Sequence, residues 1–400
     1  MKRKINQAVI LCGGKGTRLG NITKTTPKPL IKFGKKSFID ILIENLSRFN
    51  FSEIILLTSY KHQLFKKKYH KKKIHNSEIL CLEEKSPLGT GGAIINSYKH
   101  LNESFLLING DTFLNFNYIN FIKIFEKSNT DASICLVKTK NKKFGGVKIK
   151  EKTIVSISKN NKSEKYVNGG VYIFKKKFFK LFEKNKIYSL ENDCLPLLIK
   201  KKRLSYFQLN NSNDFIDIGT PEDLKKAKKI FKNYKRPAVL LDRDGVVNED
   251  LGYVHHHKNF FWKKNIIKLI KYFNKKNYFI FVISNQSGIG RGYYSFKDLK
   301  KLENWIRGEL YGENAFIDDF FYAPYFKESR KYSSKYHELL RKPNTGMIKL
   351  IENKWSVDKT KYILFGDQKS DIKLGKKISA KSFLVKEKSD IFKIIKEKKL

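Results

Sequence analysis

The chain has few cysteines, no long apolar run and a shortage of acidic residues, and each shortage excludes a class of protein. Its four cysteines are Cys12, Cys81, Cys135 and Cys194, and because none forms a Cys-x-x-Cys pair, their spacing gives no sign of a zinc or redox motif. No segment reaches the ~18 consecutive apolar residues of a transmembrane helix, and the basic start of the chain precedes an apolar run too short for a signal peptide. We therefore expect reduced, structural cysteines in a soluble, cytoplasmic protein that has no membrane partner.

Acidic residues are outnumbered by basic ones, since 38 Asp and Glu stand against 83 Lys and Arg and give a formal net charge of +45. Such a charge is typical of proteins that bind nucleic acids or anionic membranes. The lysines are nevertheless scattered over nearly every expected helix, and no basic block is interleaved with a nucleic-acid module. We interpret the excess as a bias of solvated faces, predict no nucleic-acid partner, and expect a diffuse positive field that favours phosphorylated substrates. The sequence does not determine an oligomeric state.

Length and periodicity indicate two α/β domains. A chain of 400 residues with 40% hydrophobic content can form two or three ordinary cores. Apolar segments of strand length alternate with helical segments, which predicts largely parallel sheets covered by helices on both faces. The expected strands are 8–12, 54–58, 78–82, 105–109, 171–174, 238–241, 278–284, 319–322 and 362–365, and two expected helices are 37–50 and 220–233. Because Tyr234-Lys-Arg-Pro237 interrupts the pattern, we predict two doubly wound domains, 1–233 and 234–400.

A glycine-rich loop follows the first expected strand. It reads Gly13-Gly-Lys-Gly-Thr-Arg18, with Pro27-Lys-Pro29 downstream. Glycines let the backbone approach a charged ligand and offer amide donors to phosphate oxygens, and Arg18 could hold a polyphosphate. Tight turns also use glycine for steric reasons, so the loop alone is weak. Its spacing departs from Gly-x-x-x-x-Gly-Lys-Ser/Thr, which disfavours a P-loop kinase or ATPase.

Residues 5–230 resemble the sugar-1-phosphate nucleotidyltransferase family, because further landmarks follow this loop in order. They are Glu84-Lys-Ser-Pro-Leu-Gly-Thr-Gly-Gly92, Asn109-Gly-Asp-Thr112, Asn168-Gly-Gly-Val171 and Asp217-Ile-Gly-Thr-Pro221. The resemblance implies a Rossmann-like fold that binds a nucleotide through Leu11, Gly13, Gly14, Gly16, Thr17, Arg18, Lys28, Leu88, Gly89 and Thr90. Arg18 and Lys28 would act in catalysis, Asp111 and Asp217 would hold Mg²⁺, and Asn168, Gly170 and Glu191 would face the sugar. Cys12 departs from the alanine that the family usually has there.

Elementary chemistry agrees with this resemblance. Joining a sugar phosphate to the α-phosphate of a nucleoside triphosphate brings two anions together, so cations must neutralise both while they are held in line. The sugar phosphate is itself the nucleophile, and no protein base is required. Asp111 and Asp217 each lie near a glycine and could separately be turn or cap residues. Two acids at strand ends in one domain favour a metal site.

A second acidic pair, Asp242 and Asp244, ends the apolar strand of Val239-Leu-Leu-Asp-Arg-Asp-Gly-Val246. Residues i and i+2 of a strand point the same way, so both carboxylates are expected to face one crevice at the carboxyl edge of the sheet. Asp-Gly is also a common turn pair. Three later segments favour chemistry, because they would bring a hydroxyl, an ammonium and more carboxylates to that edge. They are Ser284-Asn-Gln-Ser287, Arg341-Lys-Pro343 and Gly366-Asp-Gln-Lys-Ser-Asp371.

This order of motifs resembles the haloacid dehalogenase-like phosphatases over residues 236–385. The resemblance implies that Asp242 attacks phosphorus to form an aspartyl-phosphate, and that Asp244 protonates the leaving oxygen and later activates water. It also implies that Mg²⁺ bridges Asp242, the backbone carbonyl of Asp244 and Asp367. Ser284 and Lys342 would steady the transferring phosphoryl group.

Finer matches resemble the heptose 1,7-bisphosphate 7-phosphatases and their histidinol-phosphatase relatives. The matching segments are Asp242-Arg-Asp-Gly-Val-Val-Asn248, Gly252-Tyr-Val-His255, Ser284-Asn-Gln-Ser-Gly-Ile-Gly-Arg-Gly292 and Arg341-Lys-Pro-x-x-Gly-Met347. The likeness implies substrate contacts from Asp250, Tyr253, Asn285, Gln286, Ser287 and Arg341. Many members carry a zinc loop of Cys-x-His followed by Cys-x-Cys. This chain has Ala323-Pro-Tyr325 and Glu338-Leu-Leu-Arg341 there, so no zinc is expected.

The two resemblances together imply a bifunctional enzyme whose substrates are a nucleoside triphosphate and a phosphorylated heptose. A 7-phosphatase would release a heptose 1-phosphate, which the other domain would convert into a nucleotide-activated heptose, a donor for surface polysaccharides. We expect GMP transfer from GTP, because the adenylyl branch belongs to a ribokinase-like family that the N-terminal half does not resemble. Three alternatives stay open: another sugar, such as a mannose-type phosphate, with UTP or CTP; histidinol phosphate as the phosphatase substrate; and a nucleic-acid-binding protein with vestigial domains.

Overall fold

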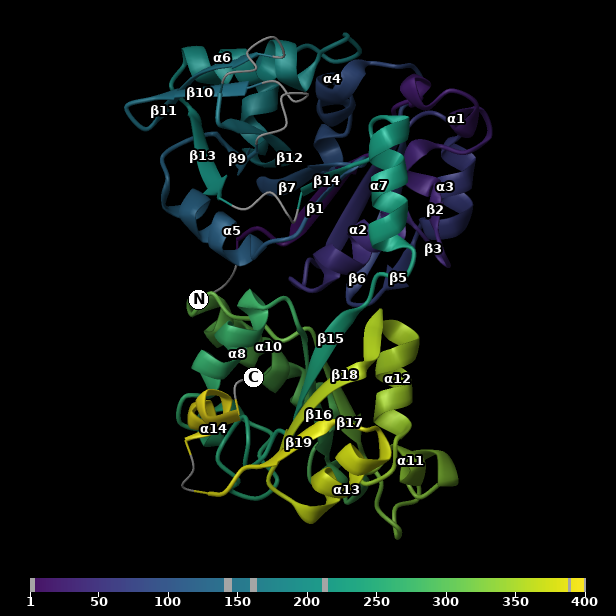
Figure 1. Ribbon diagram of the computed structural model, residues 1–400, viewed down its shortest axis with the longest axis vertical. Helices are drawn as coiled ribbons and strands as arrows, with labels where there is room; N and C mark the ends of the chain where they lie inside the picture. Colours follow the sequence, from purple (N-terminus) through teal and green to yellow (C-terminus); the bar gives the residue numbers. More distant parts are fainter. Residues whose placement is uncertain (1–3, 140–145, 159–163, 211–214, 388–389, 399–400) are drawn as a thin grey trace. The chain divides into compact units, whose positions relative to one another are not determined.

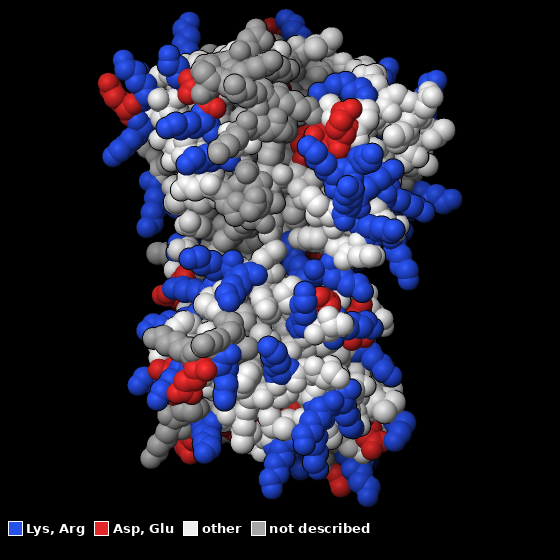
Figure 2. Space-filling model, viewed as in Figure 1, with Lys and Arg blue, Asp and Glu red and all other residues white. Residues whose placement is uncertain are grey.

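The computed structural model describes residues 4–139, 146–158, 164–210, 215–387 and 390–398. These residues form two compact units that meet in sequence between Asn233 and Tyr234 (Figure 1). In the described part of the chain, no helix combines the length and the apolar character needed to cross a lipid bilayer. Lysine and arginine are spread over both units on the face shown in Figure 2, with Asp and Glu among them.

The first unit is built on a mixed sheet with the order β11-β10-β12-β7-β1-β4-β6-β5, to which β9 and β13 are added at β12. The strands β7, β1, β4 and β6 are parallel, whereas β12 is antiparallel to β7. The strands of this sheet are β1 (Gln7–Leu11), β4 (Glu53–Thr58), β5 (Lys72–Ile74), β6 (Ser77–Glu83), β7 (Ser104–Asn109), β9 (Ala132–Lys138), β10 (Gly146–Lys150), β11 (Thr153–Ser158), β12 (Tyr166–Lys175) and β13 (Leu204–Leu209). Two short pairs complete the unit: β2 (Lys32–Phe33) with β3 (Lys36–Ser37), and β8 (Thr112–Leu114) with β14 (Phe215–Asp217).

Helices cover this sheet. They are α1 (Asn21–Thr25), α2 (Phe38–Ser47), α3 (His62–Tyr69), α4 (Gly89–Asn96), α5 (Tyr118–Lys127), α6 (Leu195–Lys200) and α7 (Pro221–Phe231). On one face, α4 and α6 pack against β1, β4 and β7 in one buried cluster. The ring of Phe231 on α7 makes edge contacts with Phe33 and Phe38, at 5.7 and 5.8 Å between centroids. The last helix of the unit is therefore fixed to its first half.

The strands expected in the first half are all present, but the prediction of a largely parallel sheet was wrong for its second part. β12 is buried along most of its length and therefore has the continuous apolar pattern of a central parallel strand. It nevertheless runs antiparallel to β7 and β9. The direction of a strand depends on the connection that precedes it. The apolar pattern of the strand itself therefore does not indicate whether it runs parallel or antiparallel to its neighbours.

The second unit is a five-stranded sheet in the order β17-β16-β15-β18-β19, and every pair in it is parallel. Its strands are β15 (Arg236–Leu241), β16 (Phe279–Asn285), β17 (Asp319–Ala323), β18 (Val357–Gly366) and β19 (Lys381–Leu384). Its helices are α8 (Ile266–Lys275), α9 (Ser287–Gly290), α10 (Phe296–Gly312), α11 (Lys335–Leu340), α12 (Gly346–Lys354), α13 (Lys369–Lys377) and α14 (Ile391–Lys398).

Alternate residues of β15 face two helical layers. Val239 and Leu241 belong to a buried cluster with α8, α10 and α14, whereas Ala238 and Leu240 belong to a cluster with α11, α12 and α13. Figure 1 shows these helices on the two sides of the sheet. A central strand covered on both faces leaves only its ends for polar side chains, so the acids that follow β15 and β18 lie at the carboxyl edge of the sheet.

Candidate active sites

A cavity of about 980 Å³ opens at the carboxyl ends of β1, β4, β6 and β7 in the first unit. Strand ends in an open parallel sheet are the usual place for a ligand. Almost all residues that the sequence predicted for this unit line the cavity: Leu11, Gly13, Gly14, Gly16, Thr17, Arg18, Lys28, Gly89, Thr90, Asp111, Asn168, Gly170, Glu191 and Asp217. Their common placement shows one site that combines a glycine loop, cations, acids and an amide.

Two small residues let the strands approach closely at the base of this cavity. A Cβ atom on Gly110 would lie 2.4 Å from the carbonyl oxygen of Leu11 and 3.3 Å from Sγ of Cys12. Only glycine fits between β1 and the turn after β7. Cys12 is buried, so its small thiol is accommodated at the position where the resemblance implies alanine.

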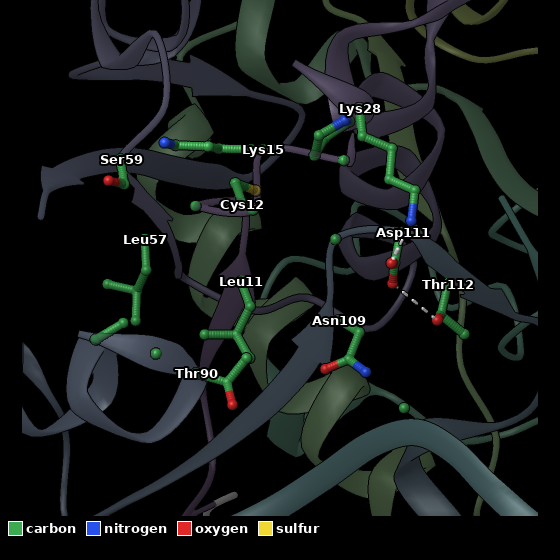
Figure 3. A pocket seen from close by; sticks show the side chains of 18 of the residues that line it. Leu11, Cys12, Lys15, Lys28, Leu57, Ser59, Thr90, Asn109, Asp111 and Thr112 are labelled. Atoms are coloured by element: carbon green, nitrogen blue, oxygen red, sulfur yellow. Dashed lines mark hydrogen bonds and ion pairs between the residues drawn. The ribbon is translucent and has the colours of Figure 1, made fainter. Parts of the chain in front are cut away.

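An ion pair lies on the lining of the cavity. Nζ of Lys28 lies 2.6 Å from Oδ2 of Asp111, and the hydroxyl of Thr112 donates to Oδ1 of Asp111 at 3.3 Å (Figure 3). Asp217 is brought close because β14 pairs with β8 and the amide of Ile218 donates to the carbonyl of Asp111 at 3.0 Å. Two acids from distant parts of the sequence therefore meet beside one lysine.

The charge state of Asp217 depends on this crowding. Burial and the neighbouring charge of Asp111 raise the pKa of Asp217 to about 6, against opposing effects from Lys28 and the amide of Gly219. A half-buried carboxyl that resists ionisation beside a second acid is typical of a site that holds a cation. Asp111 and Asp217 fit a hard divalent ion in their donor chemistry.

We expect Asp217→Asn to stabilise the metal-free first unit at neutral pH. The folded-state pKa lies above the unfolded value, so stability from this group is complete below pH ~4 and is lost as pH rises through about 6. The loss amounts to roughly 3 kcal/mol at ~1.4 kcal/mol per pKa unit. In chelator at pH 7.5, the urea concentration at the midpoint of unfolding, followed by circular dichroism, should therefore be higher for the variant than for the parent. At pH 4 the two midpoints should be the same.

The three tryptophans supply the control for this measurement, because Trp262, Trp305 and Trp355 all lie in the second unit. Their fluorescence transition should not move with Asp217→Asn. Equal stability of variant and parent at pH 7.5 in the circular dichroism signal would contradict the assigned environment of Asp217.

Leu88 is an exception among the predicted nucleotide-binding residues. Its side chain is buried and it is absent from the lining of the cavity. The reason is local: its amide donates to Oε1 of Glu84 at 2.9 Å, its carbonyl accepts from the amide of Tyr188, and it caps α4. The side chain of Leu88 is therefore not part of the cavity lining, and nucleotide contact by this residue stays a prediction.

The cavity is also lined by residues that the sequence analysis did not assign to the site. Lys15, Glu84 and Asn192 line it. Asn192 follows Glu191 in a π-helical turn, Leu190–Cys194, and such turns are frequent at functional sites. Glu84 begins a segment already noted as a family landmark, and its position at the end of β6 was the signal that could have identified it.

In the second unit, three carboxylates and one lysine meet at the carboxyl edge of the sheet. Asp242, Asp367 and Asp371 each place one oxygen within 4.8 Å of the others. Nζ of Lys342 lies 2.8 Å from Oδ1 of Asp242 and 2.6 Å from Oδ1 of Asp371. The side chain of Asp242 is 10% exposed, so it is nearly buried but reachable. Asp371 belongs to a motif that the sequence singled out, but the sequence reading gave it no role.

Burial governs the acids of this site. It raises the pKa of Asp242 to about 8, opposed by Lys342 and reinforced by Asp371, and it also raises the pKa of Asp367. Oδ1 of Asp367 is buried and has no hydrogen-bond partner among the described residues. Gly245 has a φ of +82°, and a Cβ there would lie 2.4 Å from Oδ2 of Asp367. An oxygen without a partner in a tight acidic cluster fits a hard divalent cation.

Asp244 lies in different surroundings. Arg243, which is fully buried, donates from Nε at 3.1 Å and Nη2 at 2.8 Å to its Oδ1. Asn248 donates to the same oxygen at 3.0 Å, and Gln286 donates to Oδ2 at 2.9 Å. The carboxylate of Asp244 is therefore held by nitrogen donors and is not part of the three-carboxylate cluster.

Asn285 and Gln286, which the sequence predicts to contact substrate, both use their side chains for bonds within the protein, and substrate contact by these two residues stays a prediction. Asn285 accepts from the amide of Lys342 at 2.9 Å and donates to its carbonyl at 3.3 Å. Gln286 is buried and bonds to Ser284, Asp244 and Tyr294. Both amides are used inside the protein: Asn285 joins the end of β16 to the loop that carries Lys342, and Gln286 joins Ser284 to Asp244 and Tyr294.

The other predicted substrate residues lie in loops and at the ends of short helices of the second unit. Asp250 and Tyr253 lie in an exposed turn, where Oδ1 of Asp250 accepts from the amide of Gly252 at 3.0 Å. Ser287 starts α9, and Arg341 follows α11 and is half-buried.

Aromatic contacts hold the segment in which the sequence lacks the cysteines of the zinc loop that the resemblance implies. The guanidinium of Arg291 lies 3.9 Å from the ring centre of Phe326, and the ring of Tyr332 packs against Phe296 and His337 at 6.0 and 5.2 Å. All four cysteines lie in the first unit. Packing of these rings orders the segment before Arg341 without thiolates.

Comparisons with known proteins match the two units separately. Residues 7–233 match the family described as Nucleotidyl transferase, and residues 246–390 match the one described as Polynucleotide kinase 3 phosphatase. The D-glycero-alpha-D-manno-heptose 1-phosphate guanylyltransferase of Campylobacter jejuni is 35% identical over 223 residues, which are 54% of this chain and 96% of that protein. The D-glycero-beta-D-manno-heptose-1,7-bisphosphate 7-phosphatase of Rhodopseudomonas palustris is 37% identical over 142 residues, 36% of this chain and 79% of that protein.

A solved structure resembles the first unit. The crystal structure of HddC from Yersinia pseudotuberculosis has a TM-score of 0.51 and 34% identity, and it covers 57% of this chain and all of that chain. The same protein has a structure complexed with GMP-PN.

Proposed function

The chain belongs to the nucleotidyl transferase family through its first unit and to the heptose bisphosphate 7-phosphatases through its second, and from this we propose that it is a bifunctional enzyme of heptose activation. The second unit removes the 7-phosphate of D-glycero-D-manno-heptose 1,7-bisphosphate. The first unit transfers GMP from GTP to the resulting heptose 1-phosphate and releases pyrophosphate. The observation that carries the proposal is that each unit gathers acids and a buried lysine at the carboxyl edge of its own sheet.

In the phosphatase, we assign the roles that the resemblance implies, and the contacts support them. A carboxylate oxygen of Asp242 attacks the 7-phosphorus, the bond from phosphorus to the heptose oxygen breaks, and Asp244 gives that oxygen a proton. Asp244 then takes a proton from the water that hydrolyses the aspartyl-phosphate. Lys342, 2.8 Å from Asp242, and the hydroxyl of Ser284 balance the charge of the phosphoryl oxygens. Asp242 and Asp367, with Asp371 beside them, would hold Mg²⁺, which supplies further positive charge against the incoming phosphate.

In the transferase, an oxygen of the heptose 1-phosphate attacks the α-phosphorus of GTP, and pyrophosphate leaves. The glycine loop offers amides to the triphosphate, and Arg18 and Lys28 supply positive charge in the cavity. Asp111 and Asp217 would hold Mg²⁺, which neutralises phosphate oxygens. Asn168, Gly170 and Glu191 lie on the lining where the sugar would bind.

Glu84 supports guanine as the base. It lies at the cavity end of β6, with Oε1 occupied by the amide of Leu88 and Oε2 close to Gly13, 3.4 Å from the position of a Cβ there. A carboxylate only accepts hydrogen bonds. Guanine presents two adjacent donors, N1–H and the N2 amino group, whereas uracil, cytosine and adenine each present at least one acceptor at the corresponding edge.

We expect Glu84→Gln to reduce the preference for GTP. The NH₂ group of glutamine would face an N–H group of guanine, and two donors cannot form a hydrogen bond with each other. A lost charged hydrogen bond of about 2 kcal/mol corresponds to a ~30-fold fall in kcat/KM for GTP. Glu53→Gln, at the opposite end of the neighbouring strand β4, is the control. Initial rates of pyrophosphate release with each of the four nucleoside triphosphates measure the effect, and an unchanged GTP preference would remove Glu84 from base recognition.

One incubation tests the function as a whole. The full chain is mixed with heptose 1,7-bisphosphate, GTP and MgCl₂, with the alpha and the beta anomer in separate tubes, because the phosphatase relatives include both anomers in their names whereas the transferase relatives carry alpha. We expect phosphate, pyrophosphate and GDP-heptose. A product formed only with UTP or CTP, or only from mannose 1-phosphate, would replace the proposed transferase substrate. Faster release from histidinol phosphate would replace the proposed phosphatase substrate.

A further inference from the structure

The side chain of Gln286 has every hydrogen-bonding group occupied inside the second unit. It is 2% exposed. Its Nε2 donates to Oδ2 of Asp244 at 2.9 Å and to Oγ of Ser284 at 2.8 Å, while its Oε1 accepts from the hydroxyl of Tyr294 at 2.5 Å. A primary amide has two donor hydrogens and one carbonyl oxygen. Both hydrogens are used, so the side chain could bond to substrate only if Oε1 accepted a second hydrogen bond.

These contacts fix the direction of each hydrogen bond. The amino side of the amide faces Asp244 and the carbonyl side faces Tyr294, which is the orientation that an ionised Asp244 requires, because a carboxylate can only accept. Because Ser284 accepts a hydrogen from Gln286, its own hydroxyl hydrogen is free to point elsewhere. In the proposed phosphatase, the available acceptor at this edge is a phosphoryl oxygen.

We propose that Gln286 is the positioning residue that sets Asp244 and Ser284 for phosphoryl transfer, and that the hydroxyl of Tyr294 locks its amide. This inference rests on the proposed phosphatase function and concerns the same site. It assigns Gln286 an action through two neighbouring groups in place of contact with the sugar. Asp244 is then held between two fixed donors, Arg243 on one side and Gln286 on the other.

Tyr294 is itself held firmly. It is 7% exposed, forms a small core with Ile289 and Leu299, and its ring stacks on His255 at 4.7 Å with an angle of 11°. His255 lies two residues after Tyr253 and contacts its carbonyl at 2.8 Å through Nδ1. The hydroxyl that bonds to Gln286 therefore belongs to a well-packed side chain, as a positioning role requires.

The test uses three variants and three substrates. Gln286→Glu replaces the NH₂ donor that faces Asp244 with a carboxylate oxygen, which is an acceptor. Gln286→Met removes all three hydrogen bonds at similar side-chain volume. Tyr294→Phe removes only the hydroxyl that donates to Gln286. The substrates are heptose 1,7-bisphosphate, glycerol 3-phosphate as a simple alkyl phosphate, and p-nitrophenyl phosphate. The leaving oxygen of an alkyl phosphate needs a proton, whereas p-nitrophenolate leaves without one, and kcat/KM reports the steps up to that departure.

We expect Gln286→Glu and Gln286→Met to lower kcat/KM by about 100-fold for both alkyl phosphates, and Tyr294→Phe by about 10-fold, as for general acids that are misplaced. The loss should be in kcat with little change in KM. For p-nitrophenyl phosphate the loss should be at least about 10-fold smaller. Tyr332→Phe is the matched control, because Tyr332 packs against the same small core, and it should leave all three substrates unchanged.

Contact between Gln286 and the sugar would give another pattern, in which KM for the heptose rises and glycerol 3-phosphate is unaffected. That result would overturn the inference. So would equal losses on all three substrates in a variant whose tryptophan fluorescence transition is unchanged. A parent chain that releases phosphate from none of the three would instead overturn the phosphatase function, so the two failures are distinguishable. If the Gln286 variants do not fold, Tyr294→Phe provides the test. Full phosphatase activity of Tyr294→Phe would contradict the proposal that the Tyr294 hydroxyl fixes the amide of Gln286.

Discussion

Phosphate release should fall by about 10⁴-fold or more in Asp242→Asn, while guanylyl transfer from a supplied heptose 1-phosphate is retained. Asparagine has nearly the same shape but cannot form the aspartyl-phosphate, and loss of a nucleophile has effects of this order. The fold should survive the change, because Lys342 keeps its partner Asp371 at 2.6 Å. Phosphate and pyrophosphate release, measured on the same preparation, give the two activities.

The control is the same substitution at another buried acid. Asp319 begins β17, at the opposite end of its strand from the catalytic edge, and pairs with Lys354 at 2.6 Å. Asp319→Asn should lower the unfolding temperature and leave kcat for phosphate release within about twofold. Phosphate release by Asp242→Asn at more than one-tenth of the parent rate would show that another group is the nucleophile.

Guanylyl transfer should fall by about 10³-fold in Asp111→Asn, with phosphate release unchanged. Asp111 lies 2.6 Å from Lys28 and beside Asp217, so its charge both balances the lysine and completes the proposed cation site. The amide retains the shape and the contact with Thr112 but gives up the negative charge that binds Mg²⁺, and removing one electrostatic contribution of this kind costs about 10²–10³ in rate. Pyrophosphate release at saturating GTP and heptose 1-phosphate measures it.

A partial rescue distinguishes the metal from the fold. Raising Mg²⁺ or supplying Mn²⁺ should recover part of the activity of Asp111→Asn, because a weakened site fills at higher concentration. If Asp111→Asn also stopped phosphate release in a folded protein, the two activities would share a site, and the assignment of one reaction to each unit would be wrong.

The sequence was sufficient for the placement of elements and for much of the chemistry. All nine expected strands are present, because buried strands read as short apolar runs bounded by turn residues. Glycines and acids at the ends of those runs then fell at the carboxyl edges of the sheets, where β1, β7, β15 and β18 end. Their positions needed no tertiary information beyond the rule that parallel strands share an edge.

The direction of β12 and the roles of Leu88, Asn285 and Gln286 could not be obtained in this way. Side chains next to a catalytic group in sequence can turn toward the ligand or toward the interior, and the choice depends on partners that are distant in the chain. Gln286 turns inward because Tyr294 and Asp244 are both in reach. The backbone of Leu88 is bonded both to Glu84, four residues earlier, and to Tyr188, which is distant in the chain.

The amino-acid sequence by itself determined that this protein has two α/β halves, each with a phosphate-type loop and a set of acids, because strand periodicity and motif spacing are local properties. Only the tertiary structure decided which acids meet, since Asp217 reaches Asp111 through the pairing of β14 with β8 and Asp371 reaches Asp242 through Lys342. It also decided which polar side chains serve the ligand and which hold their neighbours. A hydrogen bond depends on distance and direction in space, and those are properties of the folded chain.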